Sequence, residues 1–169
     1  AGNDRYFYGD NRNGDWNASF PNTFTVISNE DVAAPELTGV SFTPASVDVT
    51  SGSAIMTFTI GHSDNLSGVF RGLVAVKSPE HGHSKSTWFY PSNVGDTQTD
   101  VDITIDQYSE AGDWTIEYII LDDNAGNDRY YYGDNRNGDW NASFSNTFTV
   151  ISNEDVESPT LTGVSFTPD

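Results

Sequence analysis

Apolar and polar residues alternate at a spacing of two along most of the chain, which is the pattern of half-buried β-strands. Residues 100–106 show it most clearly, with three aliphatic residues set between acidic and polar ones. The pattern predicts strands at residues 37–43, 54–60, 69–77, 86–90, 101–105, 114–120 and 148–150. Residues 86–90 are expected at a sheet edge, because Pro91 has no backbone N–H to donate to a neighbouring strand.

About seven short strands separated by turn residues, without an apolar pattern of helical spacing, predict an all-β protein. The expected architecture is an immunoglobulin-like antiparallel β-sandwich. The chain has no cysteine, so Trp114 and the aliphatic strand residues must form the core without a disulfide. In the third predicted strand, Phe70, Val74 and Val76 are expected to point inward.

Residues 1–44 return almost unchanged as residues 125–168. The pairs that differ are Phe7/Tyr131, Pro21/Ser145, Ala33/Glu157, Ala34/Ser158 and Glu36/Thr160. Self-similarity at a fixed, domain-sized period indicates a tandem-repeat module. We therefore expect residues 1–32 to be the C-terminal part of a preceding repeat, residues 33–156 a complete module, and residues 157–169 the first strand of the following repeat.

The chain is strongly acidic, with 25 Asp and Glu against seven Lys and Arg and a formal charge of −18. Such a charge repels nucleic acid and anionic membranes and attracts multivalent cations. No apolar run is long enough to span a membrane, which predicts no membrane insertion. The alternative is that the acidic surface only keeps an extracellular or salt-adapted protein soluble.

Four short motifs carry a resemblance to a known family. They are Thr-Gly-Val-Ser-Phe-Thr-Pro (38–44), His-Ser-Asp-Asn-Leu-Ser-Gly-Val (62–69), Gln-Tyr-Ser-Glu-Ala-Gly-Asp-Trp-Thr-Ile (107–116) and Leu-Asp-Asp-Asn-Ala-Gly-Asn (121–127). With them, residues 34–152 resemble the bacterial Ig-like repeats, or extender domains, of large secreted and surface-anchored adhesins. The resemblance implies a calcium-rigidified extracellular spacer that contacts neighbouring repeats and is not an enzyme. Residues 128–145 depart from a minimal sandwich and leave an added binding role open.

Calcium binds six to eight oxygen ligands, so its sites are expected in loops rich in Asp and Asn. Two such loops follow the second and sixth predicted strands, and in a sandwich they can meet at one end. Their candidate ligands are Asp64, Asn65, Asp122, Asp123, Asn127 and Asp128. The alternative is a solvated acidic turn in which Asn and Gly tolerate left-handed backbone.

A second acidic cluster runs from Asp134 to Trp140 and is repeated at residues 10–16. Asp134, Asn137 and Asp139 are its candidate calcium ligands. It is not an EF-hand, because Gly138 comes one place early and no closing Glu follows. The alternative is a turn between two strands, with Arg136 paired locally.

A third cluster precedes each copy of the first predicted strand. Its candidate ligands are Glu30 and Asp31, repeated as Glu154 and Asp155. Calcium bound there together with loops of the next module would stiffen the joint between modules. The alternative is a short acidic hinge, although no Gly/Ser-rich spacer is present.

Aromatic residues suggest a rival function. Tyr130, Tyr132 and Trp140 lie beside Asn and Asp, and their rings could stack on sugars in a calcium-assisted carbohydrate-binding module. Alternating aromatic residues more often fill a core or form cross-strand pairs.

Other features point to weaker alternatives. His62, His81 and His83 could suggest zinc, but the sequence around His81 and His83 favours a hairpin tip. No Ser/His/Asp triad context, phosphate-binding loop or nucleophile elbow is visible. Residues 157–169 of one chain could add a strand to residues 1–32 of an identical chain, giving a self-assembling fibre or surface-layer subunit.

Overall fold

The computed structural model describes residues 5–153, 155 and 157–166. The chain divides into two compact units, Ala1–Glu30 and Asp31–Asp169, and each is described by itself. Within the described residues, no helix has the length and apolar character needed to cross a membrane.

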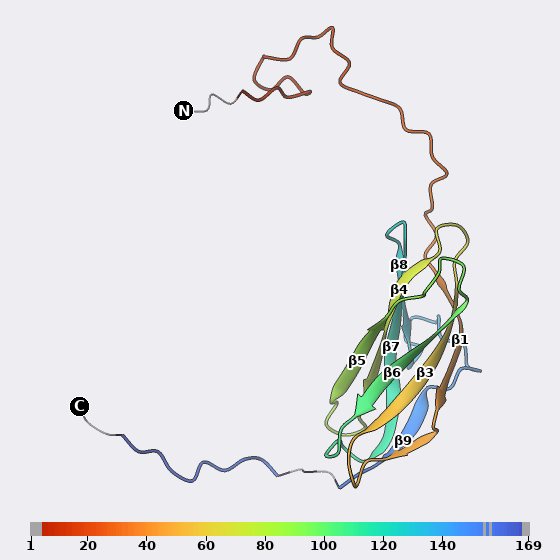
Figure 1. The fold of residues 1–169 in the computed structure, drawn as a ribbon, viewed down its shortest axis with the longest axis vertical. Coiled ribbons are helices and arrows are strands. Elements are labelled where there is room, and N and C mark those ends of the chain that lie inside the picture. Colours follow the sequence, from red (N-terminus) through yellow and green to blue (C-terminus); the bar gives the residue numbers. More distant parts are fainter. Residues whose placement is uncertain (1–4, 154, 156, 167–169) are drawn as a thin grey trace. The chain divides into compact units, whose positions relative to one another are not determined.

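The second unit is an all-β structure of two sheets (Figure 1). Its strands are β1 (Glu36–Thr43), β2 (Ser46–Asp48), β3 (Ala54–Ser63), β4 (Val69–Lys77), β5 (Ser84–Phe89), β6 (Gln98–Ile105), β7 (Gly112–Asp123), β8 (Asp128–Tyr132) and β9 (Thr147–Ile151). One sheet has the order β1-β3-β6, and the other has the order β2-β9-β7-β4-β5 with β8 also paired to β7. The prediction of an all-β fold is confirmed, with nine strands in the described residues rather than about seven.

One hydrophobic core fills the space between the inner faces of the two sheets. Aromatic rings join them: Phe42 of β1 and Phe58 of β3 each lie 5.8 Å, centroid to centroid, from Phe148 of β9. Trp114 of β7 is buried beside Phe148, and its indole N–H donates to the Glu110 carbonyl at 2.8 Å. The core role predicted for Trp114 is therefore confirmed.

All seven predicted strands are present, and β5 lies at the edge of its sheet as predicted. The alternation pattern does not predict β2 or β8. β2 has only three residues, too few to show a period, and it pairs in parallel with β9. The larger sheet is consequently mixed rather than purely antiparallel.

β7 is long enough to pair with two strands in succession along the same edge. Its first residues, 112–115, pair with β9, and residues 118–122 pair with β8. The chain leaves the sheet after β8, forms a loop over residues 133–146 and returns as β9. Gly133 permits this exit, because a Cβ there would lie 2.0 Å from the Ile116 carbonyl oxygen.

The expected inward orientation is confirmed for Val74 and Val76 but is wrong for Phe70, which is 49% exposed. The pairing of β4 with β7 shifts register between Val69 and Arg71. Such an irregularity interrupts the alternation of the two faces, so Val69 enters the core and Phe70 faces outward.

The first unit contains no strand among its described residues, although residues 23–27 repeat the sequence of β9. Residues 157–166 repeat the sequence around β1 and also form no strand. The rest of the strand predicted at 157–169 lies outside the described residues. Strand formation at these sequences therefore depends on their surroundings.

Candidate metal centre

Three carboxylates from distant parts of the chain converge at one end of the sandwich. Asp31 precedes β1, Asp64 begins the loop between β3 and β4, and Asp123 is the last residue of β7. One oxygen from each of the three side chains lies within 4.8 Å of the others. The structure thus joins part of the first predicted cluster to Asp31 of the third.

Asp64 is positioned by its own loop. Its Oδ2 atom accepts hydrogen bonds from the backbone N–H of Leu66 at 3.0 Å and of Gly68 at 2.7 Å. Its Oδ1 atom is buried and accepts no hydrogen bond within the described part of the chain. A buried carboxylate oxygen without a donor is costly, so this atom is suited to receive a cation.

Asp123 is the most buried of the three, at 3% exposure. Its Oδ1 atom accepts the backbone N–H groups of Ala125 and Asn127, each at 2.8 Å. The Asn127 side-chain amide donates to Asp123 Oδ2 at 2.7 Å and to the Asp31 carbonyl at 3.1 Å. Asn127 therefore links the turn after β7 to the segment before β1.

Asp31 is held against the loop between β3 and β4. Its Oδ2 atom accepts the backbone N–H of Ser67 at 2.8 Å, and its Oδ1 atom accepts that of Ala33 at 3.2 Å. The Ser67 side chain lowers the pKa of Asp31 most; burial opposes this effect, and the two N–H groups add to it. These interactions favour the charged form.

The three carboxylates form a group that could hold a metal ion. Each side chain supplies oxygen, the ligand atom that calcium prefers, and none of the three forms an ion pair with Lys or Arg in the described part of the chain. Three uncompensated carboxylates at this distance repel one another, and a bound divalent cation would remove that repulsion. Asp31, Asp64 and Asp123 are the residues that would hold it, with Asn127 beside them.

The other residues predicted for this site lie elsewhere. Asp122 points to the outer face of the sheet, because successive strand residues point to opposite faces, and it accepts Arg71 Nε–H at 2.6 Å. Asn65 and Asp128 are exposed, and neither belongs to the converging carboxylates.

The second predicted cluster forms a turn whose acids pair with arginine. Arg129 donates to Asp139 at 2.7 Å, and Arg136 lies 3.5 Å from Asp134. The Asn137 side-chain amide donates to Asp139 and to the Tyr130 carbonyl. These contacts match the turn alternative, with Arg136 paired locally. The two arginines neutralise the carboxylates of Asp134 and Asp139, which makes them weaker ligands for a cation.

The remaining residues of the third predicted cluster are not gathered with Asp31. Glu30 is exposed and belongs to the first unit. Asp155 is exposed and lines a cavity near the tip of the β4–β5 hairpin. Glu154 lies outside the described residues.

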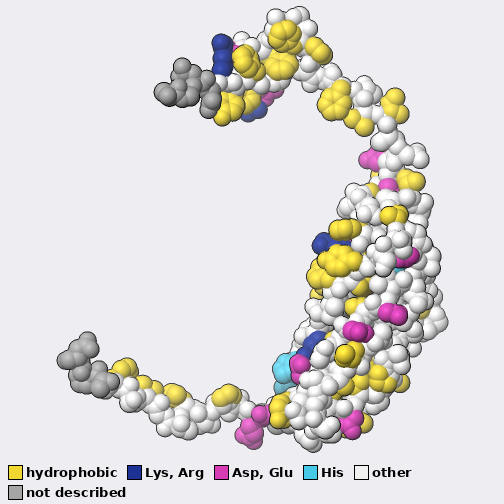
Figure 2. Space-filling view, viewed as in Figure 1, with side chains coloured by type: hydrophobic (Ala, Val, Ile, Leu, Met, Phe, Trp, Pro, Cys, Tyr) yellow, Lys and Arg dark blue, Asp and Glu magenta, His cyan; other side chains and the backbone are white. Residues whose placement is uncertain are grey.

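Aromatic side chains line a groove on the outer face of the larger sheet. The groove has a volume of about 470 Å³ and is lined by Phe70, Arg71, Trp88, Ile120, Asp122, Asp123, Gly126, Asp128 and Tyr130. The Arg71 guanidinium lies 4.4 Å from the Trp88 ring centroid. Figure 2 shows hydrophobic side chains gathered beside basic ones on the surface of the sandwich.

The three predicted sugar-stacking residues have different surroundings. Tyr130 is partly exposed at the groove and stacks on Tyr132, with ring centroids 6.0 Å apart. Trp140 is buried against Phe144, so its ring is not available to a ligand. Trp88 and Arg71 were not predicted as binding residues. The available signal was the alternation of Trp88 with the inward-facing Phe89 on an edge strand.

Comparison of the sequence with protein-family models and with curated proteins found no match.

Proposed function

We propose that this chain is a calcium-stabilised Ig-like repeat that acts as a stiff spacer in an extracellular bacterial adhesin or surface fibre. The observation that carries the proposal is the convergence of Asp31, Asp64 and Asp123, with the buried Asp64 Oδ1 left without a donor. The order β9-β7-β4-β5 in one sheet and β1-β3-β6 in the other also suits the strand arrangement of that sandwich class.

Calcium at this centre would stiffen the entry to the sandwich. Asp31 belongs to the segment that leads into β1, whereas Asp64 and Asp123 belong to loops at the end of the sheets. A cation shared by all three would tie the incoming chain to both loops. Asp155 occupies the position equivalent to Asp31 in the second copy of the sequence, so the same arrangement can recur from module to module.

Thermal unfolding in calcium and in EDTA tests this proposal. A ligand that binds only the folded state at a hundred times its Kd stabilises that state by about 2.7 kcal/mol, or on the order of 10 °C in Tm for a module of this size. We therefore expect a clear rise in Tm with calcium. An unchanged midpoint would contradict the calcium proposal.

Asp64→Asn is the sharpest variant, because it keeps the size of the side chain and removes the charge beside the unpartnered oxygen. The calcium-dependent rise in Tm should be lost in Asp64→Asn and kept in Asp113→Asn. Asp113 is an exposed acid at the start of β7, the opposite end of that strand from Asp123. If both variants lost the calcium-dependent rise in Tm equally, the rise would be due to the overall negative charge and not to a site at Asp64.

Glycan binding is the second candidate function, and the aromatic groove is the observation that favours it. Sugar rings present C–H faces that pack on aromatic rings and hydroxyls that bond to charged groups in the plane. Trp88 and Tyr130 supply partly exposed rings, and Arg71 and Asp122 supply a donor and an acceptor between them.

A glycan array followed by affinity electrophoresis tests this candidate. Retention should fall at least about tenfold in Trp88→Ala, the size of effect expected when one stacking ring is lost. Tyr108→Ala, which removes an exposed ring outside the groove, should leave it unchanged. Absence of retention on every glycan would count against the candidate without affecting the calcium proposal.

A further inference from the structure

A second group of possible metal ligands lies at the other end of the sandwich. Glu80 and His81 are in the turn between β4 and β5, and Glu110 precedes β7. One ligand atom from each lies within 4.8 Å of the others. β7 runs from this end to Asp123, so the group is separate from the carboxylates described above.

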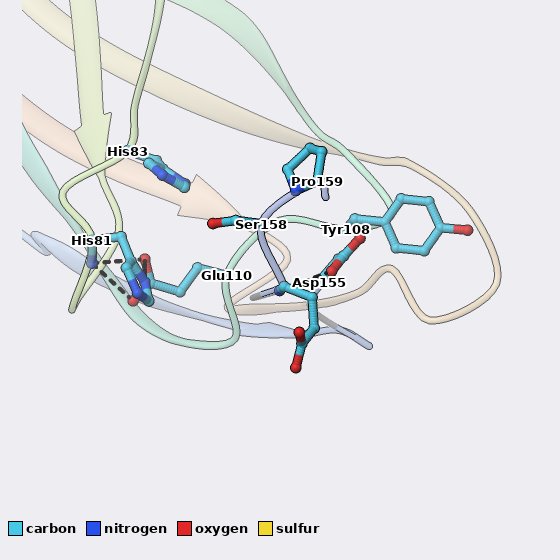
Figure 3. Close-up of a pocket in the computed structure, with 8 residues that line it drawn as sticks. His81, His83, Tyr108, Glu110, Asp155, Ser158 and Pro159 are labelled. Carbon is cyan, nitrogen blue, oxygen red and sulfur yellow. Dashed lines mark hydrogen bonds and ion pairs between the residues drawn. The ribbon is translucent and has the colours of Figure 1, made fainter. Parts of the chain in front are cut away.

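Glu110 is the rigid member of the group. It is 6% exposed, and its carboxylate accepts the backbone N–H groups of Glu80, at 2.5 Å, and His81, at 3.1 Å. These bonds hold the hairpin turn on the carboxylate and aim Oε2 at the His81 ring, as Figure 3 shows. A carboxylate has about four lone-pair positions, so the two backbone donors and the Ser78 side chain leave room for one further partner.

The spacing of the two nearest ligand atoms suits a small tetrahedral ion. His81 Nδ1 lies 3.4 Å from Glu110 Oε2. Zinc bonds of about 2.0–2.1 Å in tetrahedral geometry place neighbouring ligand atoms about 3.4 Å apart. These two atoms already stand at the separation of two zinc ligands, and Glu80 offers a third ligand atom within 4.8 Å of both.

Further donors border the same position. His83 lies beside His81, with ring centroids 5.8 Å apart. Both histidines and Glu110 line one cavity of about 290 Å³, together with Asp155 and Glu157. His81 and His83 are both exposed, so the position is open to solvent.

We propose that Glu80, His81 and Glu110 bind a divalent transition metal of the zinc class, with His83 as the candidate fourth ligand. Imidazole nitrogen favours zinc, nickel and copper, whereas calcium takes oxygen ligands. The two ends of the sandwich therefore select different ions. This proposal does not rest on the calcium proposal, and each can fail alone.

Zinc titration of the whole chain by calorimetry, in excess calcium, tests the proposal. Calcium in excess competes with zinc for the oxygen-only carboxylates. We expect saturation at one zinc per chain and weaker binding at lower pH, because the metal competes with protons for imidazole. His81→Gln should raise the zinc Kd at least about tenfold, and Glu80→Gln should raise it less.

Asp100→Asn is the matched control, because it removes a carboxylate from the exposed face of β6 and should leave the zinc Kd unchanged. Glu110 is avoided as a test residue, since it supports the hairpin. Imidazole NMR supplies a second readout, in which zinc should shift the His81 ring resonances and leave those of the buried His62 in place. Binding without saturation, or equal affinity in His81→Gln, would overturn the proposal and leave His81 and Glu110 as an ion pair only.

Discussion

Buried carboxylates in this sandwich are held mainly by backbone N–H groups. Asp123 accepts two of them from the turn that follows it, and Glu110 accepts two from the turn between β4 and β5. A neutral amide could not accept the same number of bonds with the same strength, because hydrogen bonds to ionised groups are stronger. Each acid therefore organises a loop at one end of the sheet.

Glu110 should make stability depend on pH. Burial alone would raise its pKa, but hydrogen bonds from the Ser78 side chain and from the His81 and Glu80 backbones lower it to about 2, against 4.5 for an unperturbed Glu. A carboxyl group whose pKa is lower in the folded state than in the unfolded state stabilises the fold at pH values above about 4.5. That contribution is lost as the pH falls toward about 2.

Urea unfolding at a series of pH values in EDTA checks this expectation. The free energy of unfolding should fall through the window below about 4.5, and the fall should be shallower in Glu110→Gln, which has no proton to take up there. Parallel pH profiles for the two proteins would show that Glu110 does not supply the effect.

At the scale of elements, the loop between β8 and β9 is determined by its own sequence. In residues 129–146, the Trp140 backbone N–H donates to Asn135 Oδ1 at 2.9 Å, and Asn135 has a positive φ of 56°. In the first copy, the Trp16 backbone N–H donates to Asn11 Oδ1 at 2.9 Å, and Asn11 has a positive φ of 54°. The same turn forms in both copies because its bonds join residues that are close in sequence.

Asn135→Ala should destabilise the sandwich by about 1–2 kcal/mol, because alanine loses the side-chain bond and is strained at positive φ. Asn135→Gly should cost less, since glycine tolerates the backbone angle. Chemical denaturation measures both. Asn11→Ala makes the matched change in the first unit and should leave the main transition unchanged; equal losses at both positions would contradict a local effect.

Strands were predictable to the extent that one face is buried along their whole length. β3 and β6 alternate without interruption, so their pattern predicts them within a few residues. The alternation in β4 is interrupted near Phe70, because the register shift there depends on pairing with β7. The outward turn of Phe70 creates part of the aromatic groove, which is why the groove could not be predicted from alternation.

At the scale of the whole molecule, a formal charge of −18 opposes folding through self-repulsion. Potassium chloride in EDTA should therefore raise Tm, as screening at about 0.15 M reduces interactions beyond about 8 Å. Calcium should raise Tm further at high salt, because direct binding to carboxylate oxygens is not replaced by screening. A calcium effect fully reproduced by potassium chloride would argue against a specific site.

The duplicated sequence separates what local sequence determines from what tertiary structure decides. The turn at Asn11 and at Asn135 forms in both copies, since its hydrogen bonds span only a few residues. Phe24 is 88% exposed and outside any strand, whereas its counterpart Phe148 is 1% exposed in β9, because a strand and a buried ring require partners from elsewhere in the chain.

The candidate metal centre follows the same division. The sequence by itself determined that acidic residues would crowd the loops and the segment before β1, and the hydrophobic period determined an all-β fold. Only the tertiary structure decided that Asp31 joins Asp64 and Asp123 while Asp122 turns away to Arg71. The reason is physical: charge and period are properties of neighbouring residues, but convergence depends on how sheets pair and where their loops meet.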